Sequence, residues 1–221
     1  STSFPLIPES FRLPGYSFFI YPFYYLPYPA ILSTIVQMML GSGSVVLTYL
    51  LGKKFLSEKA GFIAALLLAV EPTTVFFSTL TMSDTLFVFS LLLSVYLLLY
   101  KPPTNKHAFA LAFIAGLVMG YAVLVRVIAQ YFAFCLLVAY GCIYHKDLLP
   151  FRKTLITIGI FAAGMVLVIA PWSMRNHRLF NSYTISSTPY ISFTQYALVY
   201  FYAYEHHIPP TEAQHIYSDP I

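Results

Sequence analysis

The chain has 221 residues, of which 59% are hydrophobic and only 9% are charged, with a formal net charge of +4. A soluble globular domain is about one-quarter charged, so this composition excludes that class and indicates a polytopic membrane protein. Apolar runs of about 17–25 residues, long enough to span a bilayer, recur along most of the sequence. Neither end has the pattern of a signal peptide, and we expect an excerpt of a longer protein with at least one further span before Ser1.

Residues 11–30, "FRLPGYSFFIYPFYYLPYPA", hold five tyrosines, four prolines and four phenylalanines around a single charge, Arg12. Tyrosine suits a membrane–water interface, where the ring lies among the acyl chains and the hydroxyl stays in water. The prolines prevent a long helix and favour short helices or extended pieces. We therefore predict that residues 1–29 form an interfacial segment at the outer face of the membrane.

Charged residues interrupt the apolar runs and mark the predicted spans. Residues 30–51 form the first span, and residues 154–172 form the last. The run 108–144 would be about 54 Å long as a single helix, which exceeds the hydrocarbon core, so we predict a hairpin folded near Arg126. Residues 60–100 are predicted to go out and back, with a turn near 71–84. Together these segments predict about six spans within residues 30–172.

The distribution of lysine gives the orientation. All seven lysines fall in three loops, at residues 52–59, 101–107 and 145–153. The positive-inside rule places those loops in the cytoplasm. The turn at 71–84 and the turn at Arg126 are then expected at the outer face.

The stretch "VEPTTVFFSTLTMSD" breaks the second apolar region. Pro72 stops a helix there, and irregular backbone at membrane depth is tolerated where it is buried in protein or lines a wet cavity. Ser83 or Asp84 is expected to cap the helix that follows, since a negative group is favoured at a helix start. Capping alone would also account for Asp84.

The cations predicted at the outer face are all arginine: Arg12, Arg126, Arg175 and Arg178. Arginine grips phosphate or carboxylate with two parallel hydrogen bonds, whereas lysine is a point charge. Two interpretations of Arg126 need no ligand: it anchors the chain among the outer headgroups, or it forms a structural ion pair with Asp84 or Glu71. The corresponding interpretation of Arg175 and Arg178 is that they are solvent-exposed charges at the interface after Trp172. The convergence of arginines and carboxylates nevertheless favours an outward cavity for an anionic, phosphate-bearing ligand.

Residues 173–221 are predicted to form an outer loop or interfacial segment. Within them, residues 183–204 carry serines, threonines and Gln195 among the rings, and their apolar stretches are too short to cross a membrane. "EHH" at 205–207 is a weak candidate metal site, and a solvated surface is the alternative. Cys135 and Cys142 lie about 10 Å apart on one helical face, too far to form a disulfide, and are interpreted as packing residues.

Several stretches, in this order along the chain, resemble one family: "RLPGY", "EPTTVFFSTLTMSDTLF", "GLVMGYAVLVR" and "APWSMRNHRLFNSYTISST". Together they resemble the GT-C glycosyltransferases, and within them the group similar to dolichyl-phosphate-mannose–protein mannosyltransferases. That group includes many bacterial members and is related to the lipid A aminoarabinose transferases. The resemblance covers nearly the whole chain, and "PW-x-x-RN" followed by "ISST" is its most specific part.

This resemblance implies a transmembrane helix bundle with its active site in an outer cavity, in a prokaryotic plasma membrane. It implies an inverting transfer of sugar from a polyprenyl-phosphate donor to a lipid or protein acceptor, and it implies no nucleic-acid partner. The catalytic base of the family follows the first span, so we expect it upstream of Ser1; Glu9 does not match that motif. No cofactor is certain, and a divalent metal is possible. The residues expected to bind the donor phosphate are Arg12, Tyr16, Glu71, Asp84, Arg126, Arg175 and Asn176.

Two alternatives from other classes remain open. A transporter or flippase of lipid-linked saccharides would also need an outer basic cavity and broken helices, although the chain has no detectable internal repeat. A non-catalytic membrane scaffold would use its arginines only to flank the bilayer. The sugar, the acceptor and the oligomeric state are not encoded in any motif that we can identify.

Overall fold

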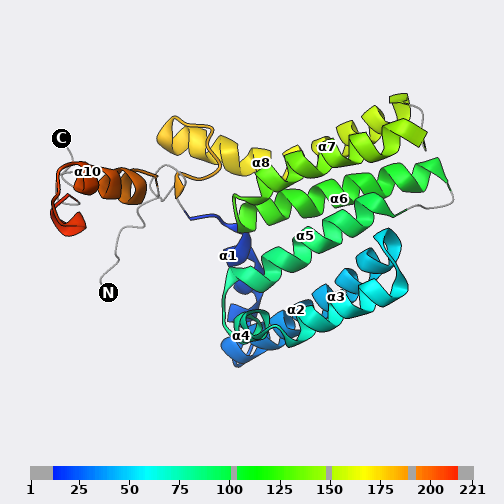
Figure 1. The fold of residues 1–221 in the computed structure, drawn as a ribbon, viewed down its shortest axis with the longest axis horizontal. Helices are drawn as coiled ribbons and strands as arrows, with labels where there is room; N and C mark the ends of the chain where they lie inside the picture. Colours follow the sequence, from blue (N-terminus) through cyan, green and yellow to red (C-terminus); the bar gives the residue numbers. More distant parts are fainter. Residues whose placement is uncertain (1–11, 101–103, 148–150, 189–192, 214–221) are drawn as a thin grey trace. The chain divides into compact units, whose positions relative to one another are not determined.

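The computed structural model describes residues 12–100, 104–147, 151–188 and 193–213. The chain divides into two compact units, a larger one formed by Leu13–Met174 and a smaller one formed by Ser1–Arg12 and Arg175–Ile221. Every regular element in the described ranges is a helix, and no strand occurs among them (Figure 1). The predicted all-α class is confirmed, while the grouping of residues 1–221 into one transmembrane domain stays a prediction.

Three helices are long and apolar enough to cross a membrane, and a bent pair gives a fourth if it counts as one span. The elements in chain order are α1 (Gly15–Ile20), the 3-10 helix η1 (Tyr21–Tyr25), α2 (Pro29–Phe55), α3 (Glu58–Val70), α4 (Pro72–Thr79), α5 (Ser83–Leu99), α6 (Asn105–Val125), α7 (Ala129–Asp147), α8 (Phe151–Phe180), the π-helix η2 (Phe193–Leu198) and α10 (Val199–Glu205). The long helices are α2, α6 and α8, the bent pair is α3 with α4, and α5 and α7 are shorter apolar helices. The chain is therefore a multi-pass membrane protein, and the number of about six spans stays a prediction.

The aromatic segment before α2 forms two short helices, as its prolines predict. Pro22 lies at the start of η1, and Pro29 begins α2 directly after Tyr28, whose φ of 58° places it in the left-handed region. The hydroxyls of Tyr21 and Tyr25 lie 2.5 Å apart, and this hydrogen bond raises the pKa of Tyr25. Most of these rings are exposed on the protein surface, as expected for residues at a membrane interface.

The predicted break near residue 71 is confirmed, but the predicted cap of the next helix is wrong. Pro72 starts α4, which bends by 55° from α3. The Glu71 carboxylate caps α4, because it accepts hydrogen bonds from the backbone N–H groups of Thr73 and Thr74 at 3.1 and 2.5 Å. The residue that caps α5 is Met82, without a side-chain hydrogen bond, because Asp84 lies inside the first turn and contacts an arginine instead.

The predicted hairpin at Arg126 is confirmed. Helix α6 ends at Val125 and α7 begins at Ala129. The turn needs neither glycine nor proline, since the N–H of Ala129 closes it by donating to the carbonyl of Arg126 at 3.1 Å.

Lys54 and Lys153 lie at one end of the larger unit, as predicted for the loops that carry them. Lys54 donates to the carbonyl of Leu99, which joins the ends of α2 and α5. Lys153, at the start of α8, donates to Asn105 at the start of α6. At the other end, the hydroxyl of Tyr121 donates to the carbonyl of Gly15 at 2.9 Å, and Figure 1 shows α1 and α4 there, away from the α2–α3 connection. Lys101 lies outside the described residues.

Glycines let the helices of the larger unit pack with their backbones nearly in contact. A methyl group on Gly52 of α2 would lie 2.6 Å from Cα of Gly61 in α3. On α6 and α8 the close contacts involve Gly116, Gly120 and Gly164. Such small residues at helix crossings are typical of membrane bundles, where close backbone approach replaces much of the hydrophobic driving force.

Many large apolar side chains are exposed on the protein surface, as expected where helices face acyl chains. Leu67 and Val70 of α3 and Phe134 of α7 are each more than three-fifths exposed. Cys135 and Cys142 are free, as predicted, but they are exposed and are not packed against other helices. Their interpretation as packing residues was wrong, because the face of α7 that carries them is directed outward.

The smaller unit has its own small core. Val199 and Ala203 of α10 pack with Ala213, and Tyr202 and Ile208 lie against them. Within residues 183–204, the described helices are η2 and the start of α10, and none of them qualifies as a span. That residues 183–204 form an interfacial element and not a span stays a prediction, because residues 189–192 lie outside the described ranges.

Candidate functional site

The seven predicted binding residues divide between the two units. Tyr16, Glu71, Asp84 and Arg126 belong to the larger unit, and Arg12, Arg175 and Asn176 belong to the smaller one. Each group is therefore described by itself.

The centre of the candidate site is an ion pair between Arg126 and Asp84. Arg126 lies in the α6–α7 turn and Asp84 in the first turn of α5. Arg126 Nη1 and Asp84 Oδ1 are 2.5 Å apart, and the two side chains are 46% and 29% exposed. The guanidinium carbon also lies 6.0 Å from the centre of the Phe87 ring. Of the two carboxylates considered as partners of Arg126, the structure shows Asp84 and not Glu71.

The pair leaves part of the guanidinium available. One nitrogen contacts the carboxylate, and a guanidinium carries five N–H donors. Because the Arg126 side chain is nearly half exposed, its remaining donors can reach a ligand at this end of the unit. Asp84 holds the group in place and offsets its charge.

A buried glutamine that sequence reasoning missed holds the backbone just before Asp84. Gln37 of α2 is 0% exposed. Its Nε2 donates to the carbonyl of Met82 at 2.6 Å and to the hydroxyl of Tyr16 at 3.2 Å. Gln37 thus joins α1 to the backbone two residues before Asp84. An amide in the middle of the apolar stretch "ILSTIVQMML" was the available signal, since polar groups inside spans need partners.

The phenol of Tyr16 is neutral at physiological pH. Burial raises the pKa of Tyr16, and the hydrogen bond from Gln37 offsets this only in part. A neutral phenol that accepts from Gln37 keeps its own proton for another acceptor. Tyr16 can therefore donate to an anionic ligand without repelling it.

We predict that Gln37→Leu lowers the free energy of unfolding by about 1–3 kcal/mol, because the Met82 carbonyl and the Tyr16 hydroxyl lose their donor. Hydrogen exchange of the backbone amides at residues 80–85 should become faster, as the α4–α5 connection loses its link to α2. Ser33→Ala is the matched control: Ser33 is also buried in α2, but among the described residues its hydroxyl bonds only to the carbonyl of Ala30 in the same helix. Equal exchange in both variants would contradict the role given to Gln37.

Glu71 has a local structural role. Both of its carboxylate oxygens accept hydrogen bonds from the first backbone N–H groups of α4. Its predicted role in ligand binding stays a prediction.

In the smaller unit, Arg175 and Asn176 are adjacent and in contact. Arg175 Nη1 donates to Asn176 Oδ1 at 2.9 Å, and the guanidinium lies 5.7 Å from the Phe180 ring. Asn176 is 1% exposed, and its Nδ2 donates to the carbonyls of Thr184 and Ile185 at 2.9 and 3.3 Å. Asn176 therefore ties the segment "YTIS" to the end of α8 and orients Arg175.

The remaining candidates are more peripheral. Arg12 lies at an exposed bend before α1. His206 of the "EHH" stretch lies against the ring of Tyr202, with centroids 4.1 Å apart. Within the described ranges, no group of three or more His, Cys, Asp or Glu side chains could hold a metal ion.

Comparison with known families accounts for the order of these motifs. Residues 14–174 match the family described as dolichyl-phosphate-mannose-protein mannosyltransferase. No curated protein and no solved structure matches the chain significantly. Since the family match covers well over half of the 221 residues, the chain belongs to this family, and the resemblance noted in its sequence is confirmed. Membership implies a membrane glycosyltransferase that uses a lipid-linked sugar donor.

Proposed function

We propose that this member of the dolichyl-phosphate-mannose-protein mannosyltransferase family transfers a sugar from a polyprenyl-phosphate donor to a protein or lipid acceptor at the outer face of a prokaryotic plasma membrane, with inversion at the anomeric carbon. The family match over residues 14–174 is the observation that carries the proposal. The arrangement of charges in the larger unit supports the details.

The outer location rests on the two ends of the larger unit. Lys54 and Lys153 lie at the end where α2 and α5 finish and where α6 and α8 begin. Arg126 and Asp84 lie at the opposite ends of α6 and α5. If the lysines are cytoplasmic, as the positive-inside rule requires, the arginine–aspartate pair lies at the outer surface, where a lipid-linked sugar on that leaflet would reach it.

The donor phosphate is assigned to Arg126. Asp84 orients the guanidinium through one nitrogen, and the other donors face the phosphate oxygens. Tyr16 donates a further hydrogen bond. A charge-assisted hydrogen bond contributes about 1.5–3 kcal/mol. Glu71 is proposed as an additional group around the donor, and the roles expected for Arg12, Arg175 and Asn176 in donor binding stay predictions.

The chemistry needs a base and a stabilised leaving group. A carboxylate removes the proton of the acceptor hydroxyl; we assign this base to no residue of the described chain. The acceptor oxygen then bonds to the anomeric carbon while the bond from that carbon to the phosphate oxygen breaks. The bond electrons stay on the phosphate, whose developing charge Arg126 stabilises, since preorganised donors act most strongly where water is excluded. Attack from the face opposite the phosphate inverts the anomeric configuration.

The test is transfer in membranes that contain the protein. We expect radiolabelled mannose to move from polyprenyl-phosphate mannose to an acceptor fraction, and nucleotide-linked mannose to give no direct transfer. The anomeric configuration of the product should be opposite to that of the donor. Movement of the intact lipid-linked sugar between leaflets, without any transfer, would contradict the proposal and favour a flippase.

A further inference from the structure

A pocket of about 430 Å³ lies on α2 and α3, at the lysine-bearing end of the larger unit. Its lining residues are Tyr49, Glu58, Lys59, Phe62 and Ile63. The proposed function uses none of these residues. The pocket is lined by one carboxylate, one ammonium group and an apolar wall.

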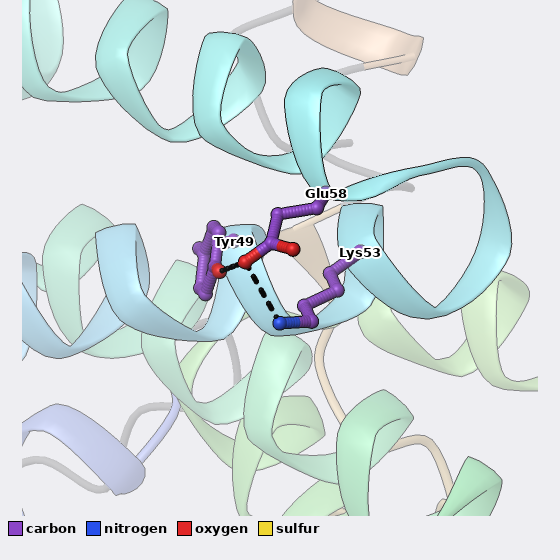
Figure 2. Close-up of polar contacts among 3 residues, drawn as sticks. All are labelled: Tyr49, Lys53 and Glu58. Atoms are coloured by element: carbon purple, nitrogen blue, oxygen red, sulfur yellow. Dashed lines mark hydrogen bonds and ion pairs between the residues drawn. The ribbon is translucent and has the colours of Figure 1, made fainter.

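The carboxylate of the pocket is fixed in position by its neighbours. Figure 2 shows the hydroxyl of Tyr49 and the ammonium of Lys53 both directed at one oxygen of Glu58, each at 2.9 Å. In the described part of the chain, the second oxygen, Oε2, accepts no hydrogen bond. It is therefore an oriented acceptor for a cationic donor.

The cation of the pocket is Lys59. Among the described residues its ammonium forms no ion pair, in contrast to Lys53, which is bound to Glu58. Glu58 and Lys59 are adjacent at the start of α3, so the pocket presents a negative and a positive group at the same level of the helix.

The apolar wall continues from these charges along α3. Phe62 and Ile63 are 61% and 56% exposed. They lie one turn beyond Glu58 and Lys59, about 6 Å further along the helix axis. If the lysine-bearing end is at the headgroup level, these side chains are at the depth where acyl chains begin. Tyr49, with its ring in the wall and its hydroxyl on Glu58, suits that boundary.

We propose that this pocket binds a zwitterionic aminophospholipid such as phosphatidylethanolamine. The phosphate of the lipid contacts Lys59, the ammonium of its headgroup donates to Oε2 of Glu58, and one acyl chain lies along Phe62 and Ile63. Charge complementarity selects this occupant. A purely anionic lipid has no cationic donor for Oε2 of Glu58, and a choline headgroup has no N–H to donate.

The test measures lipid binding by fluorescence quenching. The only native tryptophan is Trp172, and Phe62→Trp adds a second reporter in the pocket wall; the signal of the parent protein is subtracted. The protein is reconstituted in phosphatidylcholine vesicles that contain equal amounts of phosphatidylethanolamine, phosphatidylglycerol or phosphatidylcholine with brominated acyl chains. We expect the brominated phosphatidylethanolamine to bind about two- to fivefold more tightly than the other two, as exposed charge contacts allow.

Two pocket variants and one control complete the test. Glu58→Gln should abolish the preference for phosphatidylethanolamine over phosphatidylglycerol, and Lys59→Gln should weaken the binding of both. Lys106→Gln, an exposed lysine in the first turn of α6 outside the pocket, should change neither. Equal quenching by the three lipids, stronger quenching by phosphatidylglycerol, or an unchanged preference in Glu58→Gln would each overturn the proposal.

Discussion

Replacing Arg126 by lysine is expected to lower the rate of sugar transfer by about ten- to a hundredfold, because the loss of a charge-assisted contact of about 1.5–3 kcal/mol changes a rate by that factor. Lysine keeps the charge and can still pair with Asp84. A guanidinium can pair with Asp84 through one nitrogen and bind a phosphate through two other N–H groups in the same plane. The ammonium of lysine has no such planar pair of donors. The rate is measured with labelled polyprenyl-phosphate mannose at matched protein levels in the membrane.

The control is Arg178→Lys. Arg178 lies in the last turn of α8 and is exposed, so it is an arginine at a helix end without an assigned contact to the donor. We expect this variant to transfer at the parental rate. If Arg126→Lys also kept the parental rate, Arg126 would be a membrane anchor or a structural partner of Asp84, since lysine extends to the interface and pairs with a carboxylate equally well.

The sequence predicted the parts of the fold that depend on local chemistry. Pro72 marked the break between α3 and α4. The hairpin at Arg126 followed from the length of the apolar run and from the side of the lysines, although no turn residue marks it. Both predictions use properties that do not depend on the rest of the fold: proline lacks a backbone N–H, and the charges of lysine and arginine must reach water.

The parts that failed depend on partners distant in the chain. Ser83 or Asp84 was expected as a cap because a carboxylate at a helix start is favourable, but Met82 caps α5. Asp84 instead pairs with Arg126, which was one of two carboxylate partners that the sequence left open. Gln37 donates a hydrogen bond to the carbonyl of Met82, which lies 45 residues later in the chain. No sequence pattern indicates that these two residues are in contact. Cys135 faces outward because of how α7 packs, which its own spacing does not determine.

A large loss of stability is expected for Gly116→Ala. Gly116 is buried in α6, and a methyl group there would lie 2.1 Å from the carbonyl oxygen and 2.9 Å from the carbonyl carbon of Phe161 in α8. These are backbone atoms, so no side-chain rotation relieves the overlap, and the two helices must separate. Phe161 is itself 0% exposed, so the separation also opens its packing. Overpacking of this kind costs about 1–3 kcal/mol.

Gly159→Ala is the matched control for that variant. Gly159 lies within α8, as Gly116 lies within α6, but a methyl group on it would meet nothing within 4 Å. Alanine has a higher helix propensity than glycine by about 0.8–1 kcal/mol, so this variant should be as stable as the parent or slightly more stable. Reversible unfolding in mixed detergent micelles measures both free energies.

The two variants also separate packing from chemistry. Helix α6 ends at Val125, directly before Arg126, so a displacement of α6 from α8 shifts the residue assigned to the donor phosphate. Gly116→Ala should therefore lose transfer activity together with stability, whereas Arg126→Lys should lose activity alone. Equal stability of the Gly116→Ala and Gly159→Ala proteins would show that α6 and α8 do not pack through this glycine. The position of Arg126 would then have to be fixed by Asp84 and the α6–α7 turn alone.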